Sequence, residues 1–97
     1  LAALIARARE LYPGFPLFVG EVGMAVRTAP EHRAADEALQ ADFLSRAVAL
    51  LQQEGLGVSL WAWRTVVPGA ETTMSLIRED GTETPALAAL TRLWKRQ

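Results

Sequence analysis

The sequence has no cysteine, and this absence excludes a disulfide framework, a cysteine-based zinc site and a thiol nucleophile. Nowhere does it contain the roughly 18 consecutive apolar residues that a membrane-spanning helix requires. It also lacks an excess of charge, because ten lysines and arginines face eleven aspartates and glutamates. Nucleic-acid-binding domains normally carry a concentrated basic face, so this balance argues against a nucleic-acid partner. Arg7, Arg9 and Glu10 interrupt the apolar start of the chain, which therefore does not resemble a signal peptide.

What remains is the composition of a small folded domain. Of the 97 residues, 51% are hydrophobic and 22% are charged. Domains usually run to about 100–150 residues, so we expect a single domain at most. The chain starts with Leu1 rather than with methionine, which is typical of a processed product or of a piece of a longer protein.

Hydrophobic periodicity predicts helices that alternate with strands. Apolar residues at helical spacing predict amphipathic helices over residues 1–11, 28–55 and 84–96. The apolar stripe of the first helix consists of Leu1, Leu4, Ile5, Ala8 and Leu11. Short apolar runs bounded by glycines predict strands over residues 17–23 and 58–63, and Asp80-Gly81 predicts a tight turn between residues 75–77 and 82–83. This alternation implies βαβ units and a parallel sheet, which is an α/β fold.

The long central helix carries the most detailed expectations. Thr28 and Glu31 fit a capping box, with Thr28 as the N-cap. A helix from Thr28 to Gly55 is long for a globular protein, so we expect a loop or a short helix before residue 36 and a left-handed C-terminal cap at Gly55. The predicted buried stripe consists of Leu39, Phe43, Ala47, Leu50 and Leu51, and the predicted solvent-facing residues are Glu37, Gln40, Arg46 and Gln53.

The two predicted strands and the last helix show different burial patterns. The first strand is apolar on both alternating faces, which predicts burial on both sides, as in a parallel sheet. In the second strand, alternation puts Ser59, Trp61 and Trp63 on one face. Thr84 and Pro85 open the last helix as its N-cap and first helical residue. Its predicted buried face consists of Leu87, Leu90, Leu93 and Trp94, and Lys95 and Arg96 suit its C-terminal end.

The predicted sheet is too small to stand alone. Two parallel strands cannot close a sheet, and both would present unpaired edges to water. The apolar content of these strands requires neighbours that the sequence does not supply. We therefore expect residues 1–97 to be a partial domain, a fragment of a larger α/β protein.

Glu21 stands out among the acidic residues because it lies at the C-terminal end of the first predicted strand, followed there by Val22 and Gly23. Catalytic groups of a (β/α)8 barrel sit at the C-terminal ends of its strands. The alternation of Leu17, Val19 and Glu21 would place this carboxylate at the mouth of such a barrel. The alternative is a strand-end glutamate that is solvated or paired with an arginine, and position alone does not separate the two.

Trp61 and Trp63 occupy the corresponding end of the second predicted strand. Two indoles beside a carboxylate resemble a sugar site, where flat apolar rings stack on the C–H face of pyranoses. Alternatively, both rings fill core volume, as aromatic side chains commonly do.

The other residues with chemical potential have simpler interpretations. His32 has no partner at metal-ligand spacing, so it is expected to be a solvated surface residue and no metal site is predicted. Arg64 suits a substrate contact or, more simply, a surface or salt-bridge role. The pair Gly20 and Gly23 is too short a motif for a phosphate-binding loop.

Several segments together resemble the C-terminal part of clan A glycoside hydrolases, particularly family 5 with its cellulase-like and mannanase-like members. Residues 16–23, PLFVGEVG, are similar to strand seven, where a proline precedes an apolar strand ending in Glu-x-Gly. Residues 40–44, QADFL, are similar to the following helix and its Gln-Ala-aromatic-Leu signature. Residues 57–63, GVSLWAW, are similar to strand eight with its terminal tryptophan, and residues 74–86 are similar to the closing leucine, Asp-Gly and Pro-Ala stretch.

This resemblance implies that the chain is the C-terminal portion of a (β/α)8 TIM barrel, about strands seven and eight with their helices. It implies a retaining O-glycoside hydrolase acting on a β-linked poly- or oligosaccharide. In that case Glu21 is the catalytic nucleophile, and Trp61 and Trp63 are the substrate-binding residues. The resemblance implies no metal and no organic cofactor, and it is compatible with a secreted or periplasmic protein. It further implies that the barrel strands before strand seven belong to a part of the protein outside this sequence.

The sequence supplies only one of the two carboxylates that a retaining glycosidase needs about 5–5.5 Å apart. The Asn-Glu pair that provides the acid/base at strand four of the family has no counterpart here, and Glu79 and Asp80 lie at a tight turn that does not suit the role. One alternative is a non-catalytic carbohydrate-binding or scaffold protein derived from the same barrel. Another is an unrelated α/β enzyme in which Glu21 binds a ligand.

Overall fold

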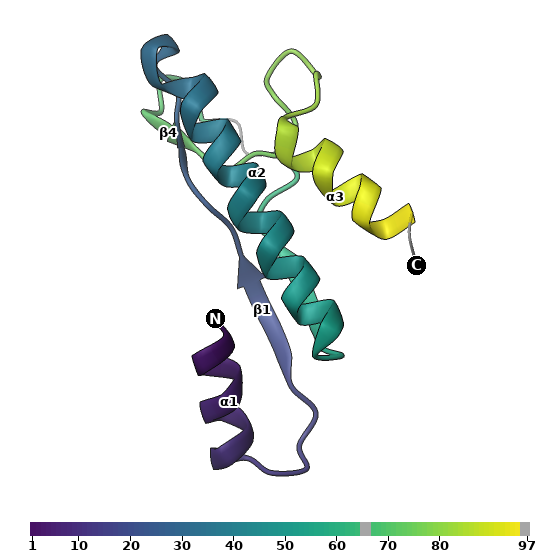
Figure 1. Cartoon of the computed structure of the whole chain (residues 1–97). Coiled ribbons are helices and arrows are strands. Elements are labelled where there is room, and N and C mark those ends of the chain that lie inside the picture. Colours follow the sequence, from purple (N-terminus) through teal and green to yellow (C-terminus); the bar gives the residue numbers. More distant parts are fainter. Residues whose placement is uncertain (65–66, 96–97) are drawn as a thin grey trace.

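A computed structural model describes residues 1–64 and 67–95 of the chain. The order of elements is α1 (Ala2–Leu11), β1 (Phe18–Val22), β2 (Val26–Arg27), α2 (Pro30–Gln53), β3 (Gly57–Leu60), β4 (Thr72–Thr73) and α3 (Pro85–Lys95). Figure 1 shows α2 at the centre, with β1 along one side of it and α3 along the other, while α1 lies at the far end beside β1. The molecule is elongated, with extents of 45 × 28 × 19 Å.

The strands form two separate pairs. β1 and β3 are parallel, with Val19 opposite Val58 and Val22 opposite Leu60, and an irregularity lies between these two positions. The predicted parallel pairing around a helix is therefore confirmed. β2 and β4 form a short antiparallel pair that the sequence pattern did not predict. Within the described residues these pairs do not join into a closed barrel.

The prediction that the first strand is buried on both sides is wrong. Phe18 is 64% exposed and Glu21 is also exposed, whereas Val19 and Val22 are partly buried. Burial on both sides requires an element packed on each face of the sheet. Here Val22 and Leu60 pack against the core beside α2, whereas Phe18 and Glu21 stay exposed.

The start of α2 differs from the expectation in two respects. The helix runs without interruption from Pro30 to Gln53, so the predicted break before residue 36 is wrong. The predicted capping box is also wrong, because Ala29 is the N-cap and no side chain caps the helix. Thr28 is engaged elsewhere: its hydroxyl donates to the Ala70 carbonyl at 2.9 Å. Proline suits the first turn, where its missing N–H would lack a helical partner in any case.

At the C-terminal end of α2, Gly55 has a φ of +70°, as the predicted left-handed cap requires.

The predicted buried stripe of α2 is confirmed for Ala47 and Leu51 and wrong for Leu39 and Phe43. Leu39 is 57% exposed and Phe43 is 43% exposed, although both belong to the predicted stripe. The residues that are actually buried are Asp36, Glu37, Gln40, Leu44, Ala47, Val48 and Leu51. The helix has apolar side chains on two faces, and packing against α3 and the strands selects the face that contains Leu44. Glu37 and Gln40, which were predicted to face solvent, are buried on this side.

The core lies between α2 and α3. Leu44 and Val48 pack with Leu76, Ala86, Leu87 and Leu90. Thr84 caps α3 as predicted, because its Oγ1 accepts the Leu87 N–H at 3.3 Å. The predicted buried face of α3 is confirmed for Leu87 and Leu90, whereas Trp94 is 44% exposed. Arg96, which was assigned to the end of this helix, lies outside the described residues.

The turn at Asp80-Gly81 is confirmed. Gly81 has a φ of +85°, and its N–H donates to the Arg78 carbonyl at 2.9 Å. Ile77 and Glu83 form an antiparallel bridge across this turn.

α1 forms as predicted but is loosely attached. Ile5 is its buried residue, whereas Leu4 is 70% exposed and Leu11 is 54% exposed. Arg9 links the helix to the end of α2, donating from Nη2 to the Glu54 carbonyl at 2.8 Å and pairing with the Glu54 carboxylate. The apolar stripe of α1 therefore faces mainly solvent.

Among the described residues, no helix is both long and apolar enough to span a bilayer.

Replacing Leu44 with alanine in the 97-residue chain should lower the free energy of unfolding by about 2–5 kcal/mol, because truncating a buried leucine leaves a cavity. Leu39→Ala is the matched control on the exposed face, and its cost should stay within about 0.5 kcal/mol. Urea unfolding in a stabilising osmolyte, followed by tryptophan fluorescence, measures both costs. Equal costs would mean that the buried face of α2 is assigned wrongly.

Candidate functional site

Glu21 lies next to the end of β1 with an exposed side chain. Among residues 1–64 and 67–95, its carboxylate has no hydrogen-bonding or ion-pair partner. Within the described residues, Glu21 is therefore not paired with an arginine, which was one of the alternatives for a glutamate at a strand end. In the part of the chain that the structure describes, the carboxylate is thus accessible to a ligand.

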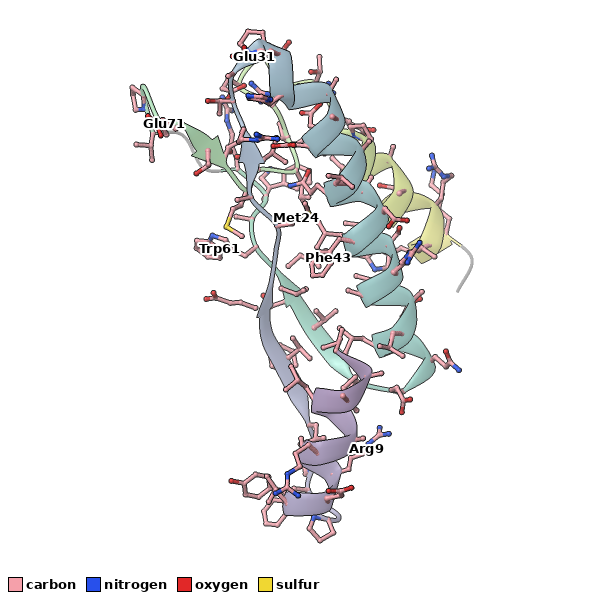
Figure 2. All side chains as sticks on the ribbon, turned by 60° about the vertical axis from the view of Figure 1, so that its left-hand side comes forward. Arg9, Met24, Glu31, Phe43, Trp61 and Glu71 are labelled. Atoms are coloured by element: carbon pink, nitrogen blue, oxygen red, sulfur yellow. The ribbon has the colours of Figure 1, made fainter. Side chains whose placement is uncertain are left out.

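Trp61 and Trp63 follow β3 and do not lie on it, because the strand ends at Leu60. The expectation that both belong to the strand is corrected in this respect. Both indoles are substantially exposed, at 48% for Trp61 and 62% for Trp63, so neither fills core volume. The peptide bond between Trp61 and Ala62 is cis. Figure 2 shows Trp61 projecting from the side of the strands that faces away from α2.

The backbone of Trp61 is hydrogen-bonded to the strand end that carries Glu21, whereas the backbone of Trp63 is hydrogen-bonded elsewhere. The Trp61 N–H donates to the Val22 carbonyl at 2.8 Å, which continues the parallel ladder beyond Leu60. The Trp63 carbonyl instead accepts the Ile77 N–H at 3.1 Å, in the segment that leads to α3. Of the two predicted sugar-binding residues, Trp61 is thus the direct neighbour of the residue after Glu21.

Gly23 allows this close approach. A Cβ at this position would lie 2.3 Å from the Trp61 carbonyl oxygen and 2.8 Å from Cε of Met74. A backbone oxygen cannot move aside as a flexible side chain can, so only glycine fits here. Gly20 is different, because a Cβ there would meet nothing within 4 Å. The close contact with the Trp61 carbonyl therefore explains why position 23, the last of Glu-x-Gly, is a glycine.

Gln40 is a buried residue of this region that the sequence reasoning assigned to solvent. Its side chain is 0% exposed, and its Nε2 donates to the Met24 carbonyl at 3.2 Å. A signal was present in the sequence, since Asp36, Gln40, Leu44 and Val48 are spaced four residues apart and so share one helix face. Because Gln40 is polar, hydrophobic periodicity does not include it in this buried face.

Asp36 and Arg27 form a second clamp between α2 and the segment after β1. Arg27 donates to the carboxylate from Nε at 2.8 Å, from Nη2 at 3.0 Å and from its backbone N–H at 3.0 Å. These hydrogen bonds, first of all those from the Arg27 side chain, hold the pKa of Asp36 well below its usual value. The segment after Glu21 is thus attached to α2 by two buried polar side chains, Asp36 and Gln40.

Glu37 attaches the segment after Trp63 to the same helix. Its buried carboxylate accepts from Nε and Nη2 of Arg78 at 3.0 and 2.9 Å, and these hydrogen bonds raise the pKa of Arg78. Glu79 accepts from its own backbone N–H and from Arg33, which lowers the pKa of its carboxyl. Arg64 donates to the Glu79 carbonyl at 3.0 Å, so in this structure it stabilises the same segment.

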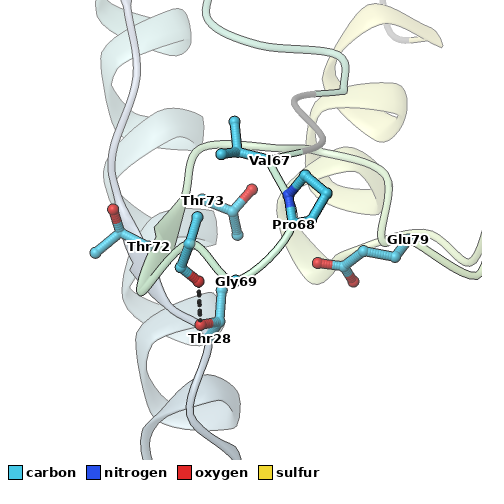
Figure 3. Close-up of a pocket in the computed structure, with 8 residues that line it drawn as sticks. Thr28, Val67, Pro68, Gly69, Thr72, Thr73 and Glu79 are labelled. Carbon is cyan, nitrogen blue, oxygen red and sulfur yellow. Dashed lines mark hydrogen bonds between the residues drawn. The ribbon is translucent and has the colours of Figure 1, made fainter.

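A pocket of about 190 Å³ lies elsewhere, between the loop over residues 67–70, the β2–β4 pair and Glu79. Figure 3 shows Thr28 on one side of it, with the hydrogen bond from its hydroxyl to the Ala70 carbonyl. Glu21, Trp61 and Trp63 are not among its lining residues. His32 is partly buried in the first turn of α2, and the described residues contain no group of histidines and carboxylates arranged to hold a metal ion.

Comparison of the chain with protein-family models, with curated proteins and with solved structures gives no match. The resemblance to glycoside hydrolases therefore stays a prediction from sequence motifs. What bears on function is the arrangement of Glu21, Gly23 and Trp61.

Gly23→Ala should destabilise the chain by about 1–3 kcal/mol, because the added methyl group collides with the Trp61 carbonyl. Gly20→Ala is the matched control in the same strand, and its effect should lie within about 0.5 kcal/mol because the methyl group enters open space. Urea unfolding measures both variants. If Gly23→Ala costs no more than Gly20→Ala, the close approach of Trp61 is refuted.

Asp36→Asn should lower stability at neutral pH, and the difference from wild type should narrow in acid. Because the folded-state pKa of Asp36 is depressed, its stabilisation is present above the unfolded pKa of about 3.9 and is lost as the pH falls towards the folded value. Urea midpoints of both proteins at about pH 7 and about pH 2.5 test this. The control is Asp42→Asn, which breaks only the exposed pair with Arg46 and should change little at either pH. A constant difference between wild type and Asp36→Asn would contradict the assignment.

Proposed function

We propose that this chain is the C-terminal part of a (β/α)8 retaining glycoside hydrolase in which Glu21 is the nucleophile. The observation that carries the proposal is the hydrogen bond from the Trp61 N–H to the Val22 carbonyl, at 2.8 Å. It joins the C-terminal ends of two parallel strands, and one of them carries the Glu21 carboxylate, which is unpaired within the described part of the chain. In (β/α)8 barrels the catalytic groups sit at this end of the strands.

The proposed reaction needs Glu21 as an ionised carboxylate. Glu21 attacks the anomeric carbon of a β-linked sugar, the bond to the leaving oxygen breaks, and that oxygen takes a proton from an acid/base carboxyl group supplied by another part of the barrel. Water, deprotonated by the same group, then attacks the glycosyl-enzyme ester and releases the sugar and the Glu21 carboxylate. The absence of a hydrogen-bonding partner for Glu21 among the described residues leaves it free to approach the substrate.

Trp61 is the better placed of the two indoles for a sugar-stacking role. Trp61 is 48% exposed, and its backbone N–H is hydrogen-bonded to the carbonyl of Val22, the residue after Glu21. A pyranose whose anomeric carbon faces Glu21 would therefore lie within the reach of this ring. Trp63, which is 62% exposed, is proposed as the platform for a more distant part of the substrate.

The exposed apolar surface supports the proposal that more of a barrel surrounds this chain. Leu4 is 70% exposed, Phe18 is 64% exposed and Leu39 is 57% exposed. The outer edges of β1 and β3 have no strand partner among the described residues. In a complete barrel, neighbouring strands and helices would cover these edges and side chains.

A non-catalytic carbohydrate-binding or scaffold protein is the second candidate. This candidate is favoured because the buried carboxylates of the chain are already in ion pairs: Asp36 is paired with Arg27 and Glu37 with Arg78. Neither of these carboxyl groups is free to act as the acid/base partner of Glu21. The two candidates differ in whether Glu21 forms a covalent intermediate.

Glu21→Gln in the complete barrel should lower the rate of hydrolysis by several orders of magnitude while substrate binding is largely retained, because the amide cannot form the glycosyl ester. A 2-fluoro glycoside with a good leaving group should trap the intermediate, and peptide mapping should find the sugar mass on the peptide containing Glu21. Glu31→Gln, at an exposed position in the first turn of α2, is the control and should keep normal turnover.

A label on a different carboxylate, or near-normal turnover of Glu21→Gln, would refute the role of Glu21. Binding of oligosaccharide without any hydrolysis would instead favour the scaffold candidate. The isolated 97-residue chain should hydrolyse nothing, because it holds one half of the catalytic pair. Turnover of an aryl β-glycoside by the isolated chain, together with cooperative unfolding, would contradict the proposal that it is part of a barrel.

A further inference from the structure

The segment that follows Glu21 is fixed at three successive residues. Val22 accepts the Trp61 N–H at 2.8 Å. Gly23 lies against the Trp61 carbonyl, and the Met24 carbonyl accepts the Gln40 amide at 3.2 Å. The contacts of Val22 and Gly23 come from the neighbouring strand end, whereas that of Met24 comes from α2. Gln40 is thus the side chain through which α2 holds Met24, three residues after Glu21.

The burial of Gln40 needs a reason other than packing. Its side chain is fully buried, and its Oε1 has no hydrogen-bonding partner among the described residues. Burying an acceptor without a partner costs free energy that an apolar side chain of the same size would avoid. The benefit of an amide at this position lies in the donor group that holds Met24.

We propose that Gln40 is a positioning residue for Glu21, an inference that rests on the proposed function. Glycine at position 23 is needed for the close approach of Trp61, yet glycine is also the residue with the greatest backbone freedom. The Glu21 carboxylate has no side-chain partner of its own within the described residues, so the backbone of β1 is what sets the starting point and the Cα–Cβ direction of this side chain. By holding the Met24 carbonyl, Gln40 restricts backbone rotation at Gly23 and so steadies the strand end that carries Glu21 next to Trp61.

A matched pair of methionine variants separates positioning from packing. Gln40→Met keeps the length of the side chain and removes the amide donor. Leu44→Met places the same residue one turn further along the same buried face, where no hydrogen bond is lost. Amide hydrogen exchange of the 97-residue chain, resolved by NMR, is compared among wild type and both variants.

Gln40→Met should increase the exchange rate of the Trp61 N–H about tenfold and shift the Gly23 and Met24 amide resonances, because the strand end opens locally. The amides of α3 should keep their rates, and Leu44→Met should leave Trp61 unchanged. Unchanged exchange at Trp61 in Gln40→Met would overturn the proposal. An equal increase at all amides would also overturn it, because that pattern indicates a purely structural role.

Kinetics of the complete barrel provide a readout that distinguishes the failure of this inference from the failure of the proposed function. Gln40→Met should lower kcat about 10- to 100-fold with KM nearly unchanged, because misplacing a nucleophile by a fraction of an ångström affects the transition state more than binding. A wild-type barrel without glycosidase activity would refute the proposed function. An active wild type with an equally active Gln40→Met variant would refute the positioning role alone.

Discussion

The parallel pairing of β1 with β3 is the constraint on which the rest of the structure depends. Parallel neighbours cannot be joined by a tight turn, so the chain between them must cross back over the sheet. Here α2 makes most of that crossing, and its length of 24 residues spans the molecule. Its position over the strands then determines where α3 packs, because Leu44 and Val48 form the core together with Leu87 and Leu90.

The same crossover helix also organises the strand ends. Three polar residues of α2 are buried, and each holds a segment that follows one of the parallel strands: Asp36 holds Arg27, Gln40 holds Met24 and Glu37 holds Arg78. Buried charges and amides are costly unless they are paired, so these contacts restrict the geometry more tightly than apolar packing would. The segments after Glu21 and after Trp63 are consequently attached to one rigid element.

The two faces of α2 have contrasting surroundings. The face with Leu44 is packed, whereas the face with Leu39 and Phe43 is exposed, together with much of the apolar stripe of α1. A helix with apolar residues on two sides is typical of one that is covered on both. In the proposed barrel, further elements would cover the exposed face of α2.

The sequence by itself determined the type and approximate extent of the main elements, because local rules are sufficient for them. Gly55 and Gly81 adopt the positive φ expected of a helix cap and a tight turn, and Thr84 caps α3 as its position before Pro85 predicts. The parallel pairing also followed from the alternation of strands and helices. The choice of Glu21 depended only on its place at a strand end, which the structure retains.

Only the tertiary structure decided which face of α2 is buried and what surrounds Glu21. The partners of Asp36, Glu37 and Gln40 are Arg27, Arg78 and Met24, which lie 9, 41 and 16 residues away in the chain. No local pattern reveals such pairs, because each one joins a residue of α2 to a residue of another segment. Likewise, Gly23 is required by the Trp61 carbonyl, which approaches from the neighbouring strand end. Contacts between distant segments depend on how the elements pack, and periodicity along one element carries no information about them.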